Sequence, residues 1–538
     1  MPARSVTTDV VVVGAGPAGL MAAASAARRG LRVVLVESDE VLGGSGAAGD
    51  GLLWLPRVPV GERGPGQAAR SYLDALYGPG DPRREAFVES AADLYQELAD
   101  LKAPLALVPG EPDGYPEETG GRRSGRVFEP VATTTRRLGR QAAQVRLRPS
   151  SATFTQRRRM VQASRSPRGV VAAVHAFGGR AVLSRLVGRE PAVGGSALLV
   201  GLVAAVLEAG VEVWRGCPLE TVDPGHPAAA VVRRDGDLVT LVAERGVVLS
   251  VGGFSHDLAA RREHLGPAAD EAWSLACPGA DGTALRLGRS LGAAQSGFGG
   301  AEWQPSLRLV DQTFHSVDLA RGLPGALLVD AAGTRFCNES SGSVELGRVM
   351  LDRSRRVSAA PAFLVVDARH RSRFPLGPWP PRLVTSNAVR DQEIAKAEHL
   401  TALAEMLGVD KAGLVGTVAR FNAFARKGRD DDFRRGASAR DKAHGLVFHR
   451  PNRALGVLDL PPYYAVRVYP AEISTRGGLL TDAAARVLSG DGEPVPGLFA
   501  VGAASALPWG DRDPGPGAGL AASLVAAMRA AAALADPA

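Results

Sequence analysis

The chain has 538 residues, of which 45% are hydrophobic and 22% are charged, and its formal net charge is +7. This composition is that of an ordinary globular protein and excludes a disordered or fibrous chain. At roughly 100–200 residues per domain, the length predicts two or three domains, or one large domain with an insertion. The basic excess is thin and forms no Lys/Arg-rich block with interleaved aromatics, so nucleic-acid binding is not predicted.

An uncharged stretch at residues 10–27 is the segment most similar to a signal peptide or a membrane span. A signal peptide carries a basic segment before its apolar run, whereas Asp9 stands there in this chain, and residues 14–17 interrupt the run. The three cysteines are far apart, with no CxxC pair and no metal-ligand spacing, which favours inert thiols in a reducing compartment. We therefore expect a soluble cytoplasmic protein without a membrane span.

The first part of the chain contains a complete strand–helix–strand unit. A β-branched run at residues 8–13 predicts a strand buried on both faces. It is followed by the pattern Gly14-x-Gly16-x-x-Gly19, by an Ala-rich helix, and by a second strand that ends in Glu37. This glycine pattern between a strand and a helix, with an acidic residue at the end of the next strand, predicts a dinucleotide-binding site.

Each residue of this pattern has a physical role. Gly14 allows the tight turn, Gly16 lets a pyrophosphate approach the backbone, and Gly19 lets the helix pack close to the sheet. The helix N-terminus, which includes Ala18, offers N–H donors and a positive dipole to the phosphates. Glu37 can accept hydrogen bonds from an adenosine ribose. This unit alone does not distinguish FAD from NAD.

A second glycine-rich loop favours FAD. Directly after the second strand, Gly43, Gly44 and Ser45 offer further backbone donors, which suit a long, extended dinucleotide. Gly49 and Gly51 continue this loop, which is too rich in glycine to be regular.

The C-terminal region carries a third glycine-rich segment. Residues 496–504 are similar to the second FAD signature of flavoproteins of the two-dinucleotide-binding type, in which Gly502 would approach the ribityl chain. The terminal helix begins after Gly517, where its N-terminus would stabilise negative charge on the flavin. We predict one non-covalent FAD. Its predicted contacts are Gly14, Gly16, Ala18, Gly19, Glu37, Gly43, Gly44, Ser45, Gly49, Gly51, Gly502, Gly517 and Leu520.

The remaining segments predict a nucleotide-binding domain that is interrupted by a second domain. Helices are expected within 66–105 and at 197–209, 395–408 and 518–535, and strands near 231 and at 247–251, 326–329 and 362–366. The predicted fold class is α/β, a Rossmann-like FAD-binding domain with an inserted α+β substrate-binding domain. The expected boundaries are 1–305 and 468–538 for the FAD-binding domain and 306–467 for the inserted domain.

Motifs of one flavoprotein family run from end to end of the chain. They lie at residues 43–56, 121–130, 325–340, 422–436, 462–482 and 510–517. On these motifs the chain resembles the fumarate reductase and 3-ketosteroid dehydrogenase group, and the steroid dehydrogenase branch fits better. The resemblance implies an FAD-dependent α,β-dehydrogenation of a hydrophobic ketone, with an unknown electron acceptor and with the substrate between the flavin and the inserted domain.

The resemblance also shows where this chain departs from its family. Two tyrosines that handle the proton and bind the ketone oxygen in the family are replaced by Ser343 and Asp513, while Gly517, whose N–H helps to bind that oxygen, is kept. Tyr115 is a loose match to a third active-site tyrosine. The predicted catalytic residues are therefore Tyr115, Ser343, Asp513 and Gly517, with Asp513 as the base if burial raises its pKa. Alternatively, Asp513 caps the terminal helix or pairs with Arg512.

Two other functions stay open at this point. The first is a flavin-dependent C=C reductase of the fumarate reductase type, which the Arg-rich region 122–159 favours. The second is a flavin-binding protein with vestigial catalysis, which the replacements at Ser343 and Asp513 favour.

Overall fold

Five parallel strands form the main sheet of this computed structural model, which describes residues 4–60, 66–148, 152–163, 190–269 and 273–536. In sheet order they are β8 (Glu212–Trp214), β2 (Val33–Val36), β1 (Arg4–Val13), β11 (Asp237–Leu249) and β23 (Pro494–Ala500). Three antiparallel strands extend the sheet: β22 (Arg486–Leu488) beside β23, and the hairpin of β9 (Leu219–Asp223) and β10 (Ala228–Arg234) beside β11.

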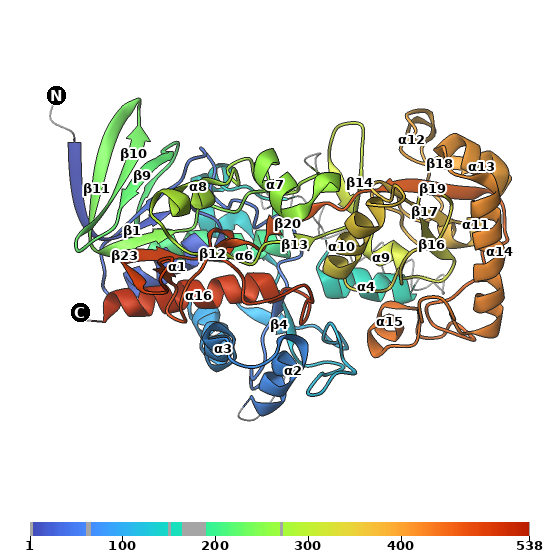
Figure 1. Ribbon diagram of the computed structural model, residues 1–538, viewed down its shortest axis with the longest axis horizontal. Helices are drawn as coiled ribbons and strands as arrows, with labels where there is room; N and C mark the ends of the chain where they lie inside the picture. Colours follow the sequence, from blue (N-terminus) through green and yellow to red (C-terminus); the bar gives the residue numbers. More distant parts are fainter. Residues whose placement is uncertain (1–3, 61–65, 149–151, 164–189, 270–272, 537–538) are drawn as a thin grey trace.

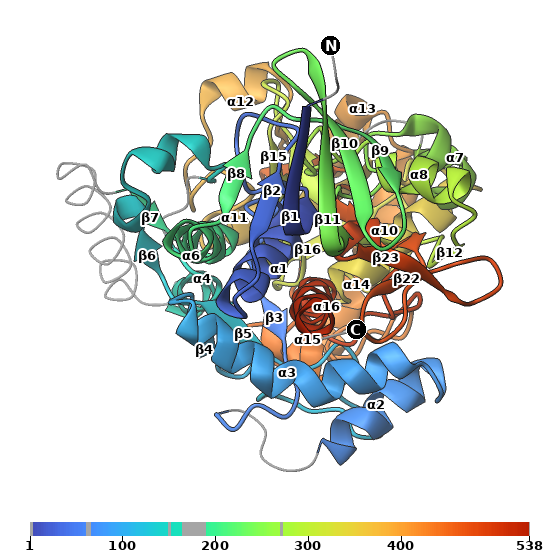
Figure 2. The same cartoon turned by 90° about the vertical axis from the view of Figure 1, so that its left-hand side faces the viewer.

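Three helices lie side by side under one face of this sheet (Figure 2). They are α1 (Pro17–Arg28), α6 (Gly195–Glu208) and α16 (Ala518–Ala535). The valines of β1 show why both faces of the strand are buried. Val10 and Val12 pack with these helices, whereas Val11 and Val13 pack into the core of the opposite face. The predicted strand–helix–strand unit and the α/β fold class are confirmed.

The terminal helix α16 is long and apolar enough, by length and composition, to cross a membrane, with a mean hydropathy of 1.7 over its 18 residues. In the structure 61% of this helix is buried, and it packs against α1 and against α3 (Pro82–Asp100). The helix therefore forms part of the protein core, as its small side chains predict.

A second sheet of four antiparallel strands lies at the other end of the molecule (Figure 1). In sheet order the strands are β16 (Ala326–Val329), β17 (Ala362–Val366), β19 (Tyr463–Val468) and β18 (Ala395–Ala397). On one face pack α13 (Leu400–Leu407) and α14 (Lys411–Lys427), and on the other face packs α10 (Ser343–Ser354).

The predicted helix at residues 395–408 is wrong in its first turn. Residues Ala395–Ala397 form β18, and α13 begins only at Leu400. The sequence there contains helix-forming residues, but the edge of β19 offers backbone partners to the segment. This pairing with a strand far along the chain overrides the local preference.

Short elements connect the two sheets. β13 (Ala301–Trp303) pairs with β20 (Glu472–Thr475), so the two connections between the sheets run side by side.

The other short strands are β3 (Leu53–Trp54), β4 (Leu105–Leu107), β5 (Val127–Pro130), β6 (Thr133–Thr134), β7 (Pro191–Ala192), β12 (Gln295–Ser296), β14 (Ser306–Arg308), β15 (Phe314–Ser316) and β21 (Gly478–Leu479). The other helices are α2 (Gln67–Tyr77), α4 (Phe154–Ala163), α7 (Leu258–Leu265), α8 (Thr283–Ser290), α9 (Asp318–Arg321), α11 (Ala368–Arg371), α12 (Ser386–Arg390) and α15 (Ala439–His444), with 3-10 turns at Thr135–Gln144, Pro267–Ala269 and Gly502–Ala504.

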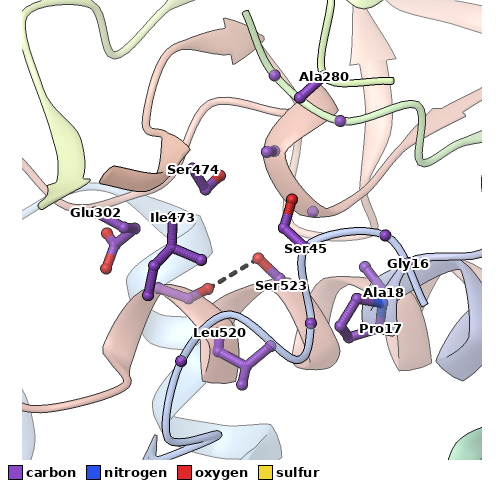
Figure 3. Close-up of a pocket in the computed structure, with 18 of the residues that line it drawn as sticks. Gly16, Pro17, Ala18, Ser45, Ala280, Glu302, Ile473, Ser474, Leu520 and Ser523 are labelled. Carbon is purple, nitrogen blue, oxygen red and sulfur yellow. Dashed lines mark hydrogen bonds between the residues drawn. The ribbon is translucent and has the colours of Figure 1, made fainter. Parts of the chain in front are cut away.

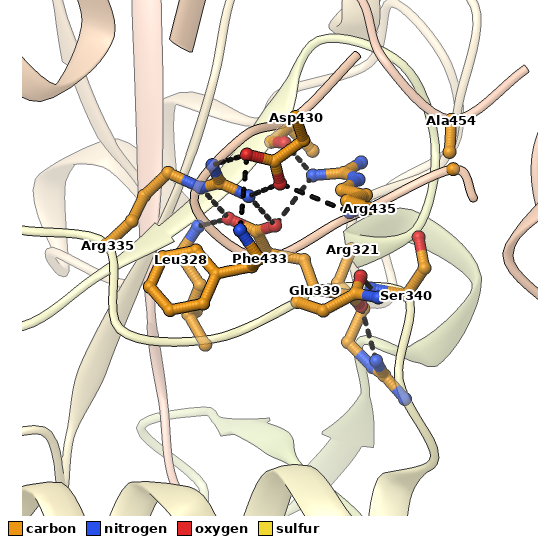
Figure 4. A network of polar contacts seen from close by, with 12 residues as sticks. Arg321, Leu328, Arg335, Glu339, Ser340, Asp430, Phe433, Arg435 and Ala454 are labelled. Atoms are coloured by element: carbon orange, nitrogen blue, oxygen red, sulfur yellow. Dashed lines mark hydrogen bonds and ion pairs between the residues drawn. The ribbon is translucent and has the colours of Figure 1, made fainter. Parts of the chain in front are cut away.

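A buried ion network fixes the turn that leads into α10 (Figure 4). Arg335 donates to both carboxylate oxygens of Glu339, at 2.8 and 2.7 Å, and Arg435 donates to one of them at 3.1 Å. Arg335 also pairs with Asp430 at 3.0 Å. Because every charge in this network has an opposite partner, the turn is held rigidly next to the first residues of α10.

Candidate active site

The turn after β1 is built for close backbone approach. Gly14 has a φ of 100°, and a Cβ there would lie 2.2 Å from the carbonyl oxygen of Ser250. A Cβ on Gly19 would lie 1.9 Å from the carbonyl oxygen of Gly14. A Cβ on Gly16, in contrast, would meet no atom within 4 Å. Gly16 therefore presents open backbone to the cavity, at the uncapped N-terminus of α1.

Glu37 closes this end of the site at the tip of β2. Its side chain lines the cavity, and one carboxylate oxygen accepts the N–H of Ala15 at 2.7 Å. The other oxygen accepts from the hydroxyl of Ser38 at 3.0 Å. The carboxylate is thus held beside the glycine turn, in the place where a ribose hydroxyl would need an acceptor.

The second glycine loop packs directly on the first. The N–H of Gly43 donates to the carbonyl of Ala15 at 2.9 Å, and a Cβ on Gly44 would lie 3.2 Å from the Cα of Gly16. Ser45 accepts the N–H of Cys277 at 2.9 Å. The two loops therefore form one continuous wall of backbone.

The C-terminal glycines complete the wall. Gly502 and Gly517 have φ values of 66° and 86°, and a Cβ on Gly517 would lie 2.0 Å from the carbonyl oxygen of Leu52. Gly517 is the N-cap of α16 and lacks a side-chain cap, so the helix N-terminus opens on the cavity. Figure 3 shows Leu520 of α16 between the Gly16 turn on one side and Glu302 on the other.

These segments line one continuous cavity of about 520 Å³. All predicted cofactor contacts except Gly19 and Gly43 line it, and these two pack behind the lining backbone. An open glycine backbone for phosphates, a carboxylate for ribose and two helix N-termini fit FAD. The residues present therefore match the cofactor that the sequence predicts.

Asp513 lies on the loop between β23 and α16 and lines the cavity together with Gly517. Its side chain is 20% exposed, and one carboxylate oxygen lies 3.9 Å from Nη2 of Arg476. Removal from bulk water and the neighbouring Glu302 carboxylate raise the pKa of Asp513 to about 7, against the opposing charge of Arg476. A carboxyl with this pKa can take up a proton near neutral pH.

Asp513 does not cap α16 itself, because the N-cap is Gly517 and no side chain caps that helix. In the turn that leads into α16, the Asp513 carboxylate accepts the N–H of Gly515 at 3.4 Å. Arg512 pairs with Glu118 at 2.7 Å rather than with Asp513.

Ser343 begins α10 and lines the same cavity. Its hydroxyl donates to a carboxylate oxygen of Asp318 at 2.8 Å and accepts from Arg321 at 3.0 Å. Arg321 also donates directly to Asp318 at 2.9 Å. Since the hydroxyl proton of Ser343 is already engaged, the residue bridges an ion pair in the cavity wall.

Tyr115 is not among the cavity-lining residues in the part of the chain that the structure describes. Its ring lies 3.9 Å from the guanidinium of Arg512, and its N–H donates to the Tyr72 hydroxyl at 3.0 Å. The preceding residue, Gly114, supports the loop that carries Asp513, because its N–H donates to the Pro514 carbonyl at 2.8 Å. The structure therefore places Tyr115 behind the Asp513 loop.

Several titratable residues of the cavity escaped sequence reasoning. They are Glu111, Glu302, Asp318, Arg321, Arg440 and His444. No local pattern marks them, because they come from separate turns and helix ends that meet only in the folded chain. Together with Ser343 they add charged and polar groups to a cavity whose lining is otherwise largely apolar.

The glycine-rich backbone of the cavity, the Glu37 carboxylate and the enclosed Asp513 together are typical of an FAD-dependent oxidoreductase. The sequence matches the family described as "FAD binding domain" over residues 9–520. It is 33% identical to the 3-oxosteroid 1-dehydrogenase of Mycobacterium tuberculosis, over 98% of this chain and 98% of that protein. It is 31% identical to the 4-oxocyclohexanecarboxylate 2-dehydrogenase of Sinomonas cyclohexanicum, over 96% of this chain and 90% of that protein.

Solved structures of flavoproteins also match this chain. The crystal structure of 3-ketosteroid delta1-dehydrogenase from Sterolibacterium denitrificans, in complex with 1,4-androstadiene-3,17-dione, matches with a TM-score of 0.92 and 31% identity, over 98% of this chain and 99% of that chain. A flavocytochrome c3 fumarate reductase shares the fold, with a TM-score of 0.66 and 21% identity over 99% and 78%. The chain belongs to the 3-ketosteroid dehydrogenase and fumarate reductase flavoprotein family, and the predicted FAD cofactor is confirmed.

Proposed function

We propose that this FAD-dependent dehydrogenase acts on a cyclic ketone and that Asp513 is its base. The observation that carries this proposal is the position of Asp513, a carboxyl with a pKa of about 7 in the cavity wall that also contains Gly517 and the N-terminus of α16. When bound, FAD supplies the hydride acceptor.

The chain's own groups account for the movement of the proton. Ionised Asp513 takes the proton from the carbon next to the carbonyl, and the electron pair of that bond passes into an enolate. The Gly517 N–H and the N-terminus of α16 stabilise the negative oxygen. The β-carbon then loses a hydride as the enolate collapses, and a C=C bond conjugated to the restored carbonyl is formed. The substrate thus loses one proton and one hydride.

The charged and polar side chains in the lining favour a ketone with polar groups of its own over a steroid as the substrate. Relatives of this chain carry the names of dehydrogenases for 3-oxosteroids and for 4-oxocyclohexanecarboxylate. Here the lining includes the Asp318–Ser343–Arg321 bridge and Glu302 beside its apolar side chains. An apolar substrate that covered these polar groups would remove them from water without offering them hydrogen bonds in exchange.

The other two functions have less support. The NADH:fumarate oxidoreductase of Klebsiella pneumoniae matches only 58% of this chain, at 24% identity, so the reductase function fits less well. A site without catalytic activity would not require a shielded carboxyl such as Asp513 beside the uncapped N-terminus of α16.

Rapid mixing tests the proposal. The oxidised holoenzyme is mixed without oxygen with 4-oxocyclohexanecarboxylate or with 4-androstene-3,17-dione, and flavin absorbance is followed. We expect a ketone to bleach the flavin, and Asp513→Asn to slow the bleaching by about 100- to 1,000-fold, with the exposed neighbour variant Asp511→Asn as the matched control. Reoxidation of reduced flavin by an enone or enoate, with no bleaching by ketones, would establish the reductase instead. No response in either direction would establish a vestigial site.

A further inference from the structure

Arg440 is a buried cation that forms no ion pair with a carboxylate in the part of the chain that the structure describes. It lies on α15, is 9% exposed, and lines the cavity. Its Nε is buried without a hydrogen-bond partner, and among the described residues no carboxylate lies within 4.0 Å of its guanidinium. Placing an unpaired guanidinium in a cavity wall costs free energy unless an anion joins it.

The acidic residues around Arg440 are engaged elsewhere. Glu111 accepts from Arg158 through one oxygen and contacts Nε2 of His444 at 2.9 Å through the other. Asp441, the next residue along the chain, accepts the N–H of Gly436 at 2.8 Å. These two acids bind other groups, and neither forms an ion pair with Arg440.

Among the described residues, the two other arginines that line the cavity are paired, so the state of Arg440 is not a general property of this wall. Arg321 binds Asp318 at 2.9 Å, and Arg286 binds Asp281 at 3.2 Å. Arg440 also acts at a distance on both Asp513 and Glu111, since its charge lowers the pKa of each. It therefore lies within electrostatic reach of the proposed base.

A helix N-terminus adds to the positive charge of Arg440. Gly342, the N-cap of α10, makes no side-chain cap, and the next two residues, Ser343 and Val344, line the cavity. A Cβ on Gly342 would lie 3.9 Å from Nη2 of Arg440. The guanidinium and the dipole of this 12-residue helix meet at one place in the cavity wall, where Glu345 in the first turn of the helix offsets part of their positive charge.

We propose that Arg440 and the N-terminus of α10 form an anion subsite, which binds a carboxylate carried by the ketone substrate. This inference rests on the proposed function, since the ketone end of the same molecule would lie at Asp513 and Gly517. The planar guanidinium offers paired N–H donors to a carboxylate, and the free first-turn N–H groups of α10 add to them. The subsite would orient the substrate and select an acidic ketone over a neutral one.

Calorimetric titration of the oxidised holoenzyme tests the subsite without any turnover. The two probes are cyclohexanecarboxylate and cyclohexanecarboxamide, which have the same ring and differ in charge. We expect the carboxylate to bind at least 10-fold more tightly than the amide. Arg440→Met should weaken carboxylate binding by about 10- to 100-fold and leave amide binding unchanged, whereas Arg440→Lys should recover part of the loss.

Two controls keep the result unambiguous. The surface variant Arg390→Met, whose side chain is 72% exposed on α12, should bind both probes like the parent enzyme. The melting temperature of each variant checks its folding. Equal binding of the two probes by the parent enzyme, no carboxylate binding up to the millimolar range, or full carboxylate binding by folded Arg440→Met would overturn the proposal. Neither probe contains a ketone, so tighter binding of the carboxylate would support the subsite even if no ketone bleaches the flavin. Conversely, efficient turnover of neutral ketones alone would support the proposed function and overturn the subsite.

Discussion

Nη2 of Arg476 lies 3.9 Å from the carboxylate of Asp513, which lines the cavity, within ion-pair range but without a hydrogen bond between them. Arg476 instead donates to Glu302 at 2.7 Å and to the carbonyl oxygen of Gly510 at 2.8 Å. The arginine therefore holds the loop of Asp513 through its backbone without donating a hydrogen bond to the carboxylate itself. If Asp513 is the base, as proposed, Arg476 thus positions it without forming a hydrogen-bonded ion pair with it.

The pH dependence of turnover follows from the raised pKa of Asp513. As a base, the carboxyl must be ionised, so kcat/KM for a ketone should rise with pH through about 7 and then level off. The measurement is a pH profile of initial rates for the parent enzyme and for Asp513→Asn. A profile that falls above pH 7 would instead identify Asp513 as a neutral hydrogen-bond donor to the ketone oxygen.

The same residue should limit stability at alkaline pH. The pKa of Asp513 is about 7 in the folded protein, against an ordinary value of 3.8. Stability contributed by this group is therefore complete below pH 3.8 and is lost as pH rises through about 7. The melting temperature of Asp513→Asn should exceed that of the parent by a margin that grows with pH, from a small difference at pH 5 to about 2–4 °C at pH 8. Equal melting temperatures at pH 8 would show that the carboxyl is not destabilised by its surroundings.

Glu37 should control FAD affinity. Glu37→Arg removes the ribose acceptor beside Ala15, and the loss of one charged hydrogen bond costs about 1.5–3 kcal/mol, or about 10- to 100-fold in Kd. Fluorescence titration of the apoprotein with FAD measures this change. The exposed Glu493→Arg on the turn before β23 is the matched control. Unchanged FAD affinity in Glu37→Arg would place the ribose elsewhere.

Two glycines of one turn should give opposite phenotypes. A Cβ on Gly16 meets nothing within 4 Å, so Gly16→Ala should fold normally but lose FAD affinity by at least about 10-fold, because the methyl group stands in the cofactor cradle. A Cβ on Gly14 overlaps Ser250, and its φ of 100° disfavours any side chain, so Gly14→Ala should destabilise the apoprotein by about 1–2 kcal/mol or more. Chemical denaturation of the two apoproteins compares them directly. Equal loss of stability in both would contradict the open position of Gly16.

The replaced tyrosines predict weak turnover of ordinary 3-ketosteroids. Ser343 is locked between Asp318 and Arg321, and loss of one proton-handling group typically costs about two to three orders of magnitude in rate. The double variant Ser343→Tyr with Asp513→Tyr should raise steroid turnover, measured with an artificial electron acceptor, and each single variant serves as its control. Robust steroid turnover by the unmodified enzyme that is insensitive to Asp513→Asn would refute the role given to these positions.

The sequence was sufficient for features that depend on neighbours along the chain. The glycine turn and Glu37 form one strand–helix–strand unit, and strands 326–329 and 362–366 and helix 518–535 follow from local patterns. It did not indicate Arg440 or Glu302, because their role arises from convergence of distant segments in one cavity. The edge pairing of β18 has the same origin. Domain boundaries, the electron acceptor and the cytoplasmic location stay predictions.

The cavity draws its walls from both ends of the chain, from Gly14 near the start to Ser523 in α16. During synthesis, the first glycine turn therefore emerges long before the segment that closes the site. Strand β23 of the same parallel sheet is also supplied late, between β22 and α16. A ribosome-bound chain that lacks residues 494–535 has neither this strand nor the helix that covers the sheet. FAD capture is thus a step that follows translation, and free FAD in the cell should set how much of the newly made chain reaches its stable fold.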